Sequence, residues 1–152
     1  MKVQDYLREQ GIPFQAREHP PAYTAQEVAA EEHVSGYMLA KTVTVKSSQG
    51  FALCVLPASY KLDLAKAAKA LKAKEVRLAD EDEMAKLFPD AEVGAEPPFG
   101  NLYNLPTLVD RRLAADEEIV FQAGTHREAV QMKYADFARL AKPTEADLAA
   151  EL

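Results

Sequence analysis

A lysine opens the alternating stretch KTVTVK, residues 41–46, and it is the first candidate for binding chemistry. Side chains alternate between the two faces of a strand, so Lys41 shares a face with Val43 and Val45, which should look inward. A cation at that edge must reach water, pair with an acid, or line a pocket for an anionic or carbonyl-bearing ligand. Lys41 is therefore either a snorkelling lysine at a strand end or part of a binding pocket.

The stretch FQAGTHR, residues 121–127, holds a second candidate group between two expected strands. A turn containing Gly124 can leave successive backbone N–H groups pointing one way, which suits an anion or a developing oxyanion. Histidine titrates near neutrality, so His126 beside this turn could act in acid–base chemistry or in hydrogen bonding. The alternative is that His126 is a polar residue at a hairpin tip.

The stretch VGAEPPFG, residues 93–100, combines two glycines with two adjacent prolines. Prolines remove backbone freedom and N–H donors, whereas glycines let the chain turn or let another molecule approach the backbone closely. Such a segment is either a stiff wall beside a ligand or a plain connection between two elements.

Several familiar chemistries are absent from the sequence. It contains no HxxxH, HExxH or CxxC spacing, and its three histidines and one cysteine are scattered. A P-loop needs a glycine-rich run before its lysine, whereas Lys41 follows Tyr37-Met38-Leu39-Ala40, and no GxSxG elbow is present. We therefore expect neither a metal ion nor another cofactor, and an enzyme of this sequence would lack an obvious protein nucleophile.

Short elements of both kinds must position these residues. A capping-box pattern over residues 24–27 predicts a helix that runs to about His33. The remaining sequence predicts further helices at residues 2–10, 62–73, 81–88 and 134–141. It predicts strands or extended segments at residues 13–18, 42–46, 51–56, 76–78, 107–109, 119–123 and 129–132.

The order of these elements indicates the fold class. Strands come mainly as hairpins, with helices between them and no regular βαβ alternation, which predicts an α+β protein. We expect a mixed, largely antiparallel sheet that curls or partly closes into a barrel flanked by helices. A chain of 152 residues, 48% of them apolar, fits one domain over residues 1–152. Residues 143–152, after the last expected helix, should form a flexible tail.

The net charge argues against bulk attraction to nucleic acid. The chain carries a formal charge of −6, so DNA is not an expected partner. Basic residues nevertheless gather between Lys61 and Arg77, where Lys66, Lys69 and Lys72 recur every three residues. These lysines form either a solvated helix face or a local phosphate-binding strip.

The sequence also bears on where the protein works. It has no apolar run of membrane-spanning length, and its first ten residues are polar and amphipathic rather than a signal peptide. Its single cysteine, Cys54, lies in the apolar run FALCVL and should be buried. We expect a cytoplasmic protein without membrane contact.

Four segments together resemble one known family over nearly the whole chain: HPPAYTAQEVA, LAKTVTVK, GAEPPFG and FQAGTHREAVQMKYADF. In this order and spacing they are similar to the YbaK/prolyl-tRNA-synthetase-associated editing-domain family. The resemblance implies a free-standing hydrolase that cleaves the ester of a mischarged aminoacyl-tRNA, typically tRNA for proline carrying a small amino acid such as alanine or cysteine. It implies the acceptor end of aminoacyl-tRNA as partner, with prolyl-tRNA synthetase as a further one, and a substrate-assisted mechanism.

The resemblance also assigns roles to individual residues. The implied catalytic residues are Lys41, Gly94, Gly124 and His126. The implied substrate-binding residues are His19, Tyr23, Thr42, Glu96, Pro97, Pro98, Phe99, Gly100, Ala123 and Thr125. Two other classes stay open, namely a non-catalytic module that binds the acceptor end or an aminoacyl group, and a hydrolase of another small ester.

Overall fold

The structure is a computed structural model that describes residues 2–18 and 39–152. The helix expected up to His33, and the expected substrate-binding residues His19 and Tyr23, lie outside the described residues.

Helices and strands alternate irregularly along the described chain. The helical elements are α1 (Val3–Glu9), α3 (Leu64–Leu71), α4 (Glu81–Leu87), the 3-10 helix η1 (Gly100–Tyr103), α5 (Arg111–Ala114) and α6 (Tyr134–Ala141). The strands are β1 (Gln15–Glu18), β2 (Ala40–Ser47), β3 (Gly50–Pro57), β4 (Tyr60–Leu62), β5 (Arg77–Leu78), β6 (Thr107–Asp110), β7 (Glu118–Gln122), β8 (Glu128–Lys133), β9 (Thr144–Ala146) and β10 (Ala149–Glu151).

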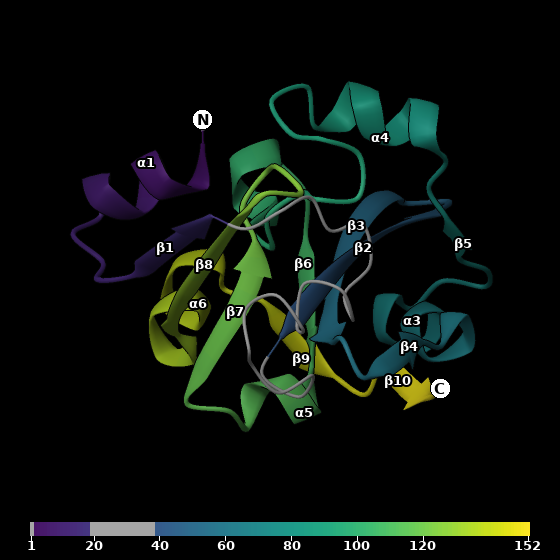
Figure 1. Cartoon of the computed structure of the whole chain (residues 1–152). Coiled ribbons are helices and arrows are strands. Elements are labelled where there is room, and N and C mark those ends of the chain that lie inside the picture. Colours follow the sequence, from purple (N-terminus) through teal and green to yellow (C-terminus); the bar gives the residue numbers. More distant parts are fainter. Residues whose placement is uncertain (1, 19–38) are drawn as a thin grey trace.

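The strands of the described residues form a five-stranded sheet in the order β5-β2-β3-β6-β9, a three-stranded sheet β1-β8-β7, and the pair β10-β4. The β2–β3 hairpin is antiparallel, whereas β6 pairs in parallel with both β3 and β9. In Figure 1, α1 and α6 lie beside the three-stranded sheet, and α3 and α4 lie toward the opposite side of the molecule. The expected α+β class is confirmed.

The described sheets are mixed and largely antiparallel, as expected, and they do not close into a barrel. The five-stranded sheet ends in β5 and β9, which pair with β2 and β6 and not with each other. A single bridge, Leu39 with Val120, joins this sheet to the three-stranded one. Both end strands are short, and a two- or three-residue strand offers too few backbone groups to continue a closed ladder.

Two apolar clusters pack against the opposite faces of β2 and β3. On one face, Ala40 joins a cluster built around three phenylalanines, in which the Phe99 ring meets Phe121 and Phe137 edge-on at centroid distances of 5.8 and 5.3 Å. On the other face, Val45 and Cys54 pack in a cluster beneath α3. The Cys54 side chain is fully buried, as predicted, and burial raises the pKa of its thiol to about 12.

The C-terminal segment is not the flexible tail that we expected. β9 pairs with β6 and β10 pairs with β4, and Leu148 between them is fully buried. The backbone N–H of Leu148 donates a 2.8 Å hydrogen bond to the buried carboxylate of Asp110. Next to it, Asp147 accepts hydrogen bonds from Arg112 and Lys66 at 3.0 and 3.2 Å. The sequence did not predict that this segment is ordered, because the segment is mostly polar and is held by only one buried leucine and two three-residue strands.

No helix among the described residues is both long and apolar enough to cross a membrane.

Candidate functional site

Two parts of the predicted site are hydrogen-bonded to each other. We call residues 93–100 the rim loop and residues 123–127 the β7–β8 turn. The Gly124 N–H donates to the carbonyl of Ala95 at 2.8 Å, and the Glu92 N–H donates back to the carbonyl of Gly124 at 2.8 Å. The chain thus brings two segments together that lie about thirty residues apart in the sequence.

His126 ties the turn to the rim loop a second time. Its backbone N–H donates to Glu92 Oε1 at 2.6 Å, and its ring Nε2 lies 2.9 Å from the carbonyl oxygen of Val93. A carbonyl can only accept, so this contact places a proton on Nε2. The ring is buried, and its Cε1 lies 3.6 Å from the position that a Cβ would take on Gly94. His126 therefore packs against Gly94 in a fixed orientation.

Both predicted glycines adopt conformations that favour glycine, with φ of +88° at Gly94 and +94° at Gly124. Their N–H groups are already engaged, because Gly94 donates to Glu96 Oε2 at 3.1 Å and Gly124 donates to Ala95. The glycines can therefore offer a ligand close approach to the backbone, whereas in this arrangement their N–H groups serve the protein itself.

Glu96 lies behind the rim loop rather than on its surface. Its side chain is 3% exposed, whereas Gly94 is exposed. Burial raises the pKa of the Glu96 carboxyl to about 6, although its own N–H, that of Gly94, the nearby His126 and the Thr44 hydroxyl all favour the charged form. Its Oε1 and the Thr44 Oγ1 are both buried, and neither has a hydrogen bond among the described residues. Glu96 therefore lies between the rim loop and β2.

Lys41 lies on β2, opposite Leu56 of β3, and is partly buried. Burial lowers the pKa of its ammonium group. No carboxylate of the described residues forms an ion pair with it. Thr44 is three residues away and points to the opposite face of the strand, about 10 Å along it at a rise of about 3.3 Å per residue. Among the described residues, no hydrogen bond or ion pair joins Lys41 to Gly94 or His126, whereas Glu96 lies between β2 and the rim loop.

The second half of the rim loop is anchored in the protein interior. Pro97, Pro98, Phe99 and Gly100 are all buried, and Phe99 is fully enclosed by the phenylalanine cluster. The Gly100 N–H donates to Thr107 Oγ1 at 3.0 Å, and a Cβ on Gly100 would come within 2.4 Å of a backbone oxygen. Phe99 and Gly100 can therefore shape a pocket by fixing the loop rather than by touching a ligand.

The remaining predicted residues surround these parts. Ala123 is buried at the end of β7, and Thr42 is partly buried on β2. The Thr125 hydroxyl donates to Glu128 Oε2 at 3.1 Å. The cavity that Pro97, Gly124 and Thr125 line has a volume of about 20 Å³, which suits one water molecule. An aminoacyl group does not fit in that cavity.

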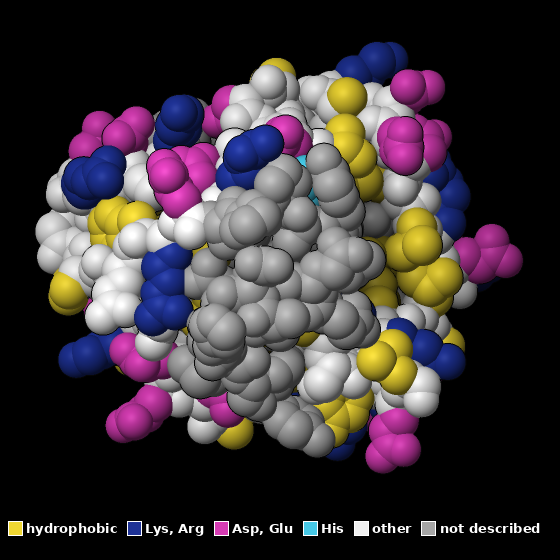
Figure 2. Space-filling model, viewed as in Figure 1, with side chains coloured by type: hydrophobic (Ala, Val, Ile, Leu, Met, Phe, Trp, Pro, Cys, Tyr) yellow, Lys and Arg dark blue, Asp and Glu magenta, His cyan; other side chains and the backbone are white. Residues whose placement is uncertain are grey.

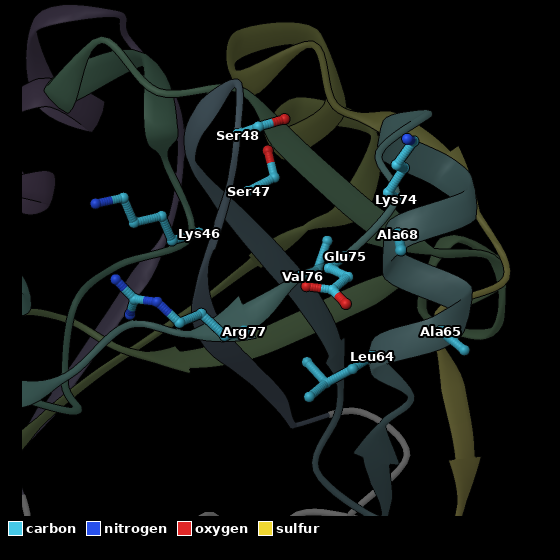
Figure 3. A pocket seen from close by; sticks show the side chains of 10 residues that line it. All are labelled: Lys46, Ser47, Ser48, Leu64, Ala65, Ala68, Lys74, Glu75, Val76 and Arg77. Atoms are coloured by element: carbon cyan, nitrogen blue, oxygen red, sulfur yellow. The ribbon is translucent and has the colours of Figure 1, made fainter.

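A larger groove lies between α3, β5 and the β2–β3 turn (Figure 3). It has a volume of about 890 Å³, and its polar lining includes Lys46, Ser47, Ser48, Lys74 and Arg77. In Figure 3 the charged ends of Lys46 and Arg77 point away from α3, whereas Lys74 lies near one end of α3 and Glu75 lies between α3 and the strands. Figure 2 shows charges of both signs interspersed over this view, and apolar atoms gathered toward the side where Figure 1 places β5 and α3.

Glu83 of α4 orients two of the cations that line the groove. Arg77 donates two hydrogen bonds to the Glu83 carboxylate, at 2.7 and 2.9 Å, and the Lys46 ammonium lies 3.6 Å from it. The hydrogen bond from Arg77 is the main cause that lowers the pKa of Glu83 to about 2. The predicted stripe on α3 is divided, because Lys66 binds Asp147 and the carbonyl of Ala149 instead of facing water freely.

Two of these residues, Glu92 and Thr44, were not predicted as site residues. Glu92 directly precedes the glycine-proline stretch. An acid at that position could have been predicted to accept a backbone hydrogen bond that holds the loop. Thr44 alternates with the valines on β2 and lies on the opposite face from Lys41. Nothing in this alternation predicts that Thr44 lies near Glu96, about fifty residues later. Among the described residues, no group of three or more His, Cys, Asp and Glu side chains could hold a metal ion.

The fold and the site together define an α+β domain in which a stiff glycine-proline loop is fastened to a hairpin turn beside a lysine-bearing strand. Residues 19–140 match the aminoacyl-tRNA editing domain family, and the chain belongs to that family. The resemblance to the YbaK/prolyl-tRNA-synthetase-associated family is confirmed. Membership supports aminoacyl-tRNA editing as the class of function, with aminoacyl-tRNA as the substrate.

Solved structures resemble the whole chain. A scaffold protein from work on epitope backbone grafting is 28% identical, with a TM-score of 0.87, over 99% of this chain and 96% of its own. A candidate trans-editing enzyme for prolyl-tRNA synthetase is 25% identical, with a TM-score of 0.87, over 97% of this chain and 94% of its own. A hypothetical protein at 23% identity and a TM-score of 0.89, over 99% of this chain and 100% of its own, supports the fold alone.

Proposed function

We propose that this protein hydrolyses the ester bond of mischarged aminoacyl-tRNA, and that its substrate is tRNA for proline carrying a small amino acid such as alanine or cysteine. The observation that carries the proposal is the rim loop fastened to the β7–β8 turn, with His126 against Gly94, in a member of the editing family. The choice of proline tRNA rests on the 25% identical candidate trans-editing enzyme for prolyl-tRNA synthetase. That synthetase is the proposed partner, in the cytoplasm, where aminoacyl-tRNAs are made.

In this proposal Lys41 supplies the positive charge. Its partly buried ammonium group positions the polar end of the substrate. It also stabilises the negative charge that develops on the carbonyl oxygen of the ester. A water molecule attacks the carbonyl carbon, the bond from that carbon to the ribose oxygen breaks, and the ribose hydroxyl leaves with a proton. An aminoacyl ester is already activated, so orientation and charge can supply the acceleration without a protein nucleophile or a metal ion.

The rim loop and the turn would supply selectivity. Gly94 and Gly124 allow the acyl or ribose group to approach the backbone, and His126 keeps Gly94 in place. The other proposed binding residues are His19, Tyr23, Thr42, Pro97, Pro98, Ala123 and Thr125, with Phe99 and Gly100 as the anchor of the loop and Glu96 behind it. A rigid wall can exclude a larger side chain by size, although one methylene is worth only about 1–3 kcal/mol.

The groove of Figure 3 is the proposed cradle for the acceptor end. Lys46, Lys74 and Arg77 line it together with the acid Glu75, and in this proposal the three cations contact the phosphates of an RNA strand. The overall charge of −6 means that such binding must be local. It also means that salt should weaken it, because binding releases counterions from the RNA.

A deacylation panel tests the proposed activity. Proline tRNA is charged separately with alanine, cysteine, serine, threonine and proline, and ester loss is followed for the parent and for Lys41→Ala. We expect rapid loss for a small non-cognate amino acid, retention of the prolyl ester, and no effect of a chelator. Binding without ester loss would favour a non-catalytic module, and equal cleavage of a small ester without tRNA would favour a different hydrolase.

A further inference from the structure

We propose that Glu96 is a positioning residue, which sets the height of the rim loop above β2 and thereby the amino-acid selectivity of the proposed site; the selectivity part rests on the proposed function. Glu96 lies behind Gly94, on the side of the loop that faces the protein interior, so it acts through Gly94 rather than on the substrate.

The contacts of the Glu96 carboxyl group join two elements. Oε2 accepts a hydrogen bond of 3.1 Å from the N–H of Gly94, two residues earlier, and so fixes the bend of the loop where φ is +88°. The Thr44 hydroxyl of β2 is close enough to this carboxyl group to favour its charged form. The carboxyl group therefore lies against both the loop and the strand.

Glu96 Oε1 and Thr44 Oγ1 have no hydrogen bond among the described residues, and a buried polar atom without one is costly. A small shift of the loop toward β2 would let the hydroxyl and the carboxyl group bond to each other. Such a shift would carry Gly94 with it, because Gly94 is bonded to the same carboxyl group.

Ionisation gives this contact a signature in solution. The titratable groups that described residues bring to Glu96 are His126 from the β7–β8 turn and Tyr103 from η1. Burial raises the pKa of Glu96 to about 6, so its charge changes within a range in which the enzyme can be assayed. Glutamine has the same length and no charge, and aspartate has the charge and one methylene less. These two substitutions therefore separate the length of the side chain from its ionisation.

The experiment compares the parent, Glu96→Gln and Glu96→Asp in deacylation of proline tRNA charged with the preferred amino acid and with a larger one. We expect Glu96→Gln to keep the parent's ratio of kcat/KM for the two substrates within about twofold, since an amide can still accept from Gly94. We expect Glu96→Asp to change that ratio by about tenfold or more, because misplacement by about an ångström can cost a hundredfold in rate. Glu81→Asp, on the exposed side of α4, is the matched control for the loss of a methylene.

A second measurement follows the Gly94 amide by NMR as the pH is raised. In the parent its chemical shift should change with a midpoint near pH 6, and in Glu96→Gln this change should disappear. An unchanged selectivity ratio in Glu96→Asp, with an active parent, would overturn the proposal and leave the proposed function intact. An amide that titrates alike in both proteins would overturn it as well. If the parent cleaves no aminoacyl-tRNA, the proposed function and the selectivity role both fall, and the amide titration alone decides whether Glu96 holds the loop.

Discussion

His126 Cε1 lies 3.6 Å from the position that a Cβ would occupy on Gly94, which is an ordinary van der Waals distance. Space therefore does not require glycine at this position, whereas its φ of +88° does. An L-residue with positive φ costs about 1–2 kcal/mol, so we expect Gly94→Ala to lower the melting temperature and to reduce deacylation. His126→Ala, combined with it, should restore neither property. Recovery in the double variant would show that the cause is a clash instead of backbone strain.

Lys41 should be the most sensitive single position for turnover. Removing one preorganised group that stabilises an oxyanion costs about 10²–10³ in kcat, and we expect a loss of that size in Lys41→Met, with little change in the melting temperature. The measurement is single-turnover deacylation at saturating enzyme. Lys133→Ala, an exposed lysine of the three-stranded sheet, should behave as the parent does. Equal rates in Lys41→Met and the parent would remove Lys41 from the mechanism.

The groove should control affinity for RNA and its dependence on salt. Each phosphate contact contributes about 0.7–0.9 to the slope of log K against log salt concentration, so Lys46→Ala and Lys74→Ala should each reduce that slope by less than one unit and weaken binding. Titration of labelled proline tRNA at several salt concentrations measures both quantities. Lys133→Ala again serves as the control, and an unchanged slope in both groove variants would place the RNA on another surface.

The C-terminal segment should contribute to stability. Truncating a buried leucine costs about 2–5 kcal/mol, and we expect a loss in this range for Leu148→Ala, which is fully buried between β9 and β10. Urea unfolding measures it. Leu152→Ala, at a residue that is 71% exposed, should change the free energy of unfolding by less than about 0.5 kcal/mol. Two equal and negligible effects would mean that the segment is a free tail after all.

The buried carboxyl group of Glu96 should make stability depend on pH. Its pKa is raised from 4.5 to about 6, so the folded state binds the proton more tightly than the unfolded state. Its contribution to stability is therefore fully present below pH 4.5 and is lost as the pH rises through 6. One pKa unit corresponds to 1.36 kcal/mol, which gives a loss of about 2 kcal/mol. Relative to the parent, Glu96→Gln should gain that amount between pH 4.5 and pH 7 in urea unfolding, and a constant difference would contradict it.

Local patterns predicted the hairpin and most helices of this fold, and pairings between distant segments escaped them. Alternation along residues 42–46 and the turn before Phe51 define β2 and β3 without reference to other strands. The parallel pairing of β6 with β3 and β9 joins residues that are 54 and 36 positions apart, and no short sequence pattern predicts such pairings. The sequence patterns missed β9 and β10, because each has only three residues and is recognisable only through its pairing with a distant strand.

The candidate site divides along similar lines. Glycine and proline spacing predicted a stiff loop, and the resemblance placed Gly124 and His126 across a pocket from it. The structure instead joins the turn directly to the loop by hydrogen bonds. The engaged N–H groups of both glycines could not be predicted, because they depend on the carboxylate of Glu96 and the carbonyl of Ala95 reaching them in three dimensions. A cavity shared by Lys41, the rim loop and the β7–β8 turn stays a prediction.

The buried thiol of Cys54 can report opening of the five-stranded sheet. It is the single cysteine of the chain, it lies on β3 between β2 and β6, and its raised pKa keeps it in the unreactive protonated form. A thiol reagent can therefore label the native protein only after these strands separate. The rate of labelling measures how often the sheet opens, without any introduced probe.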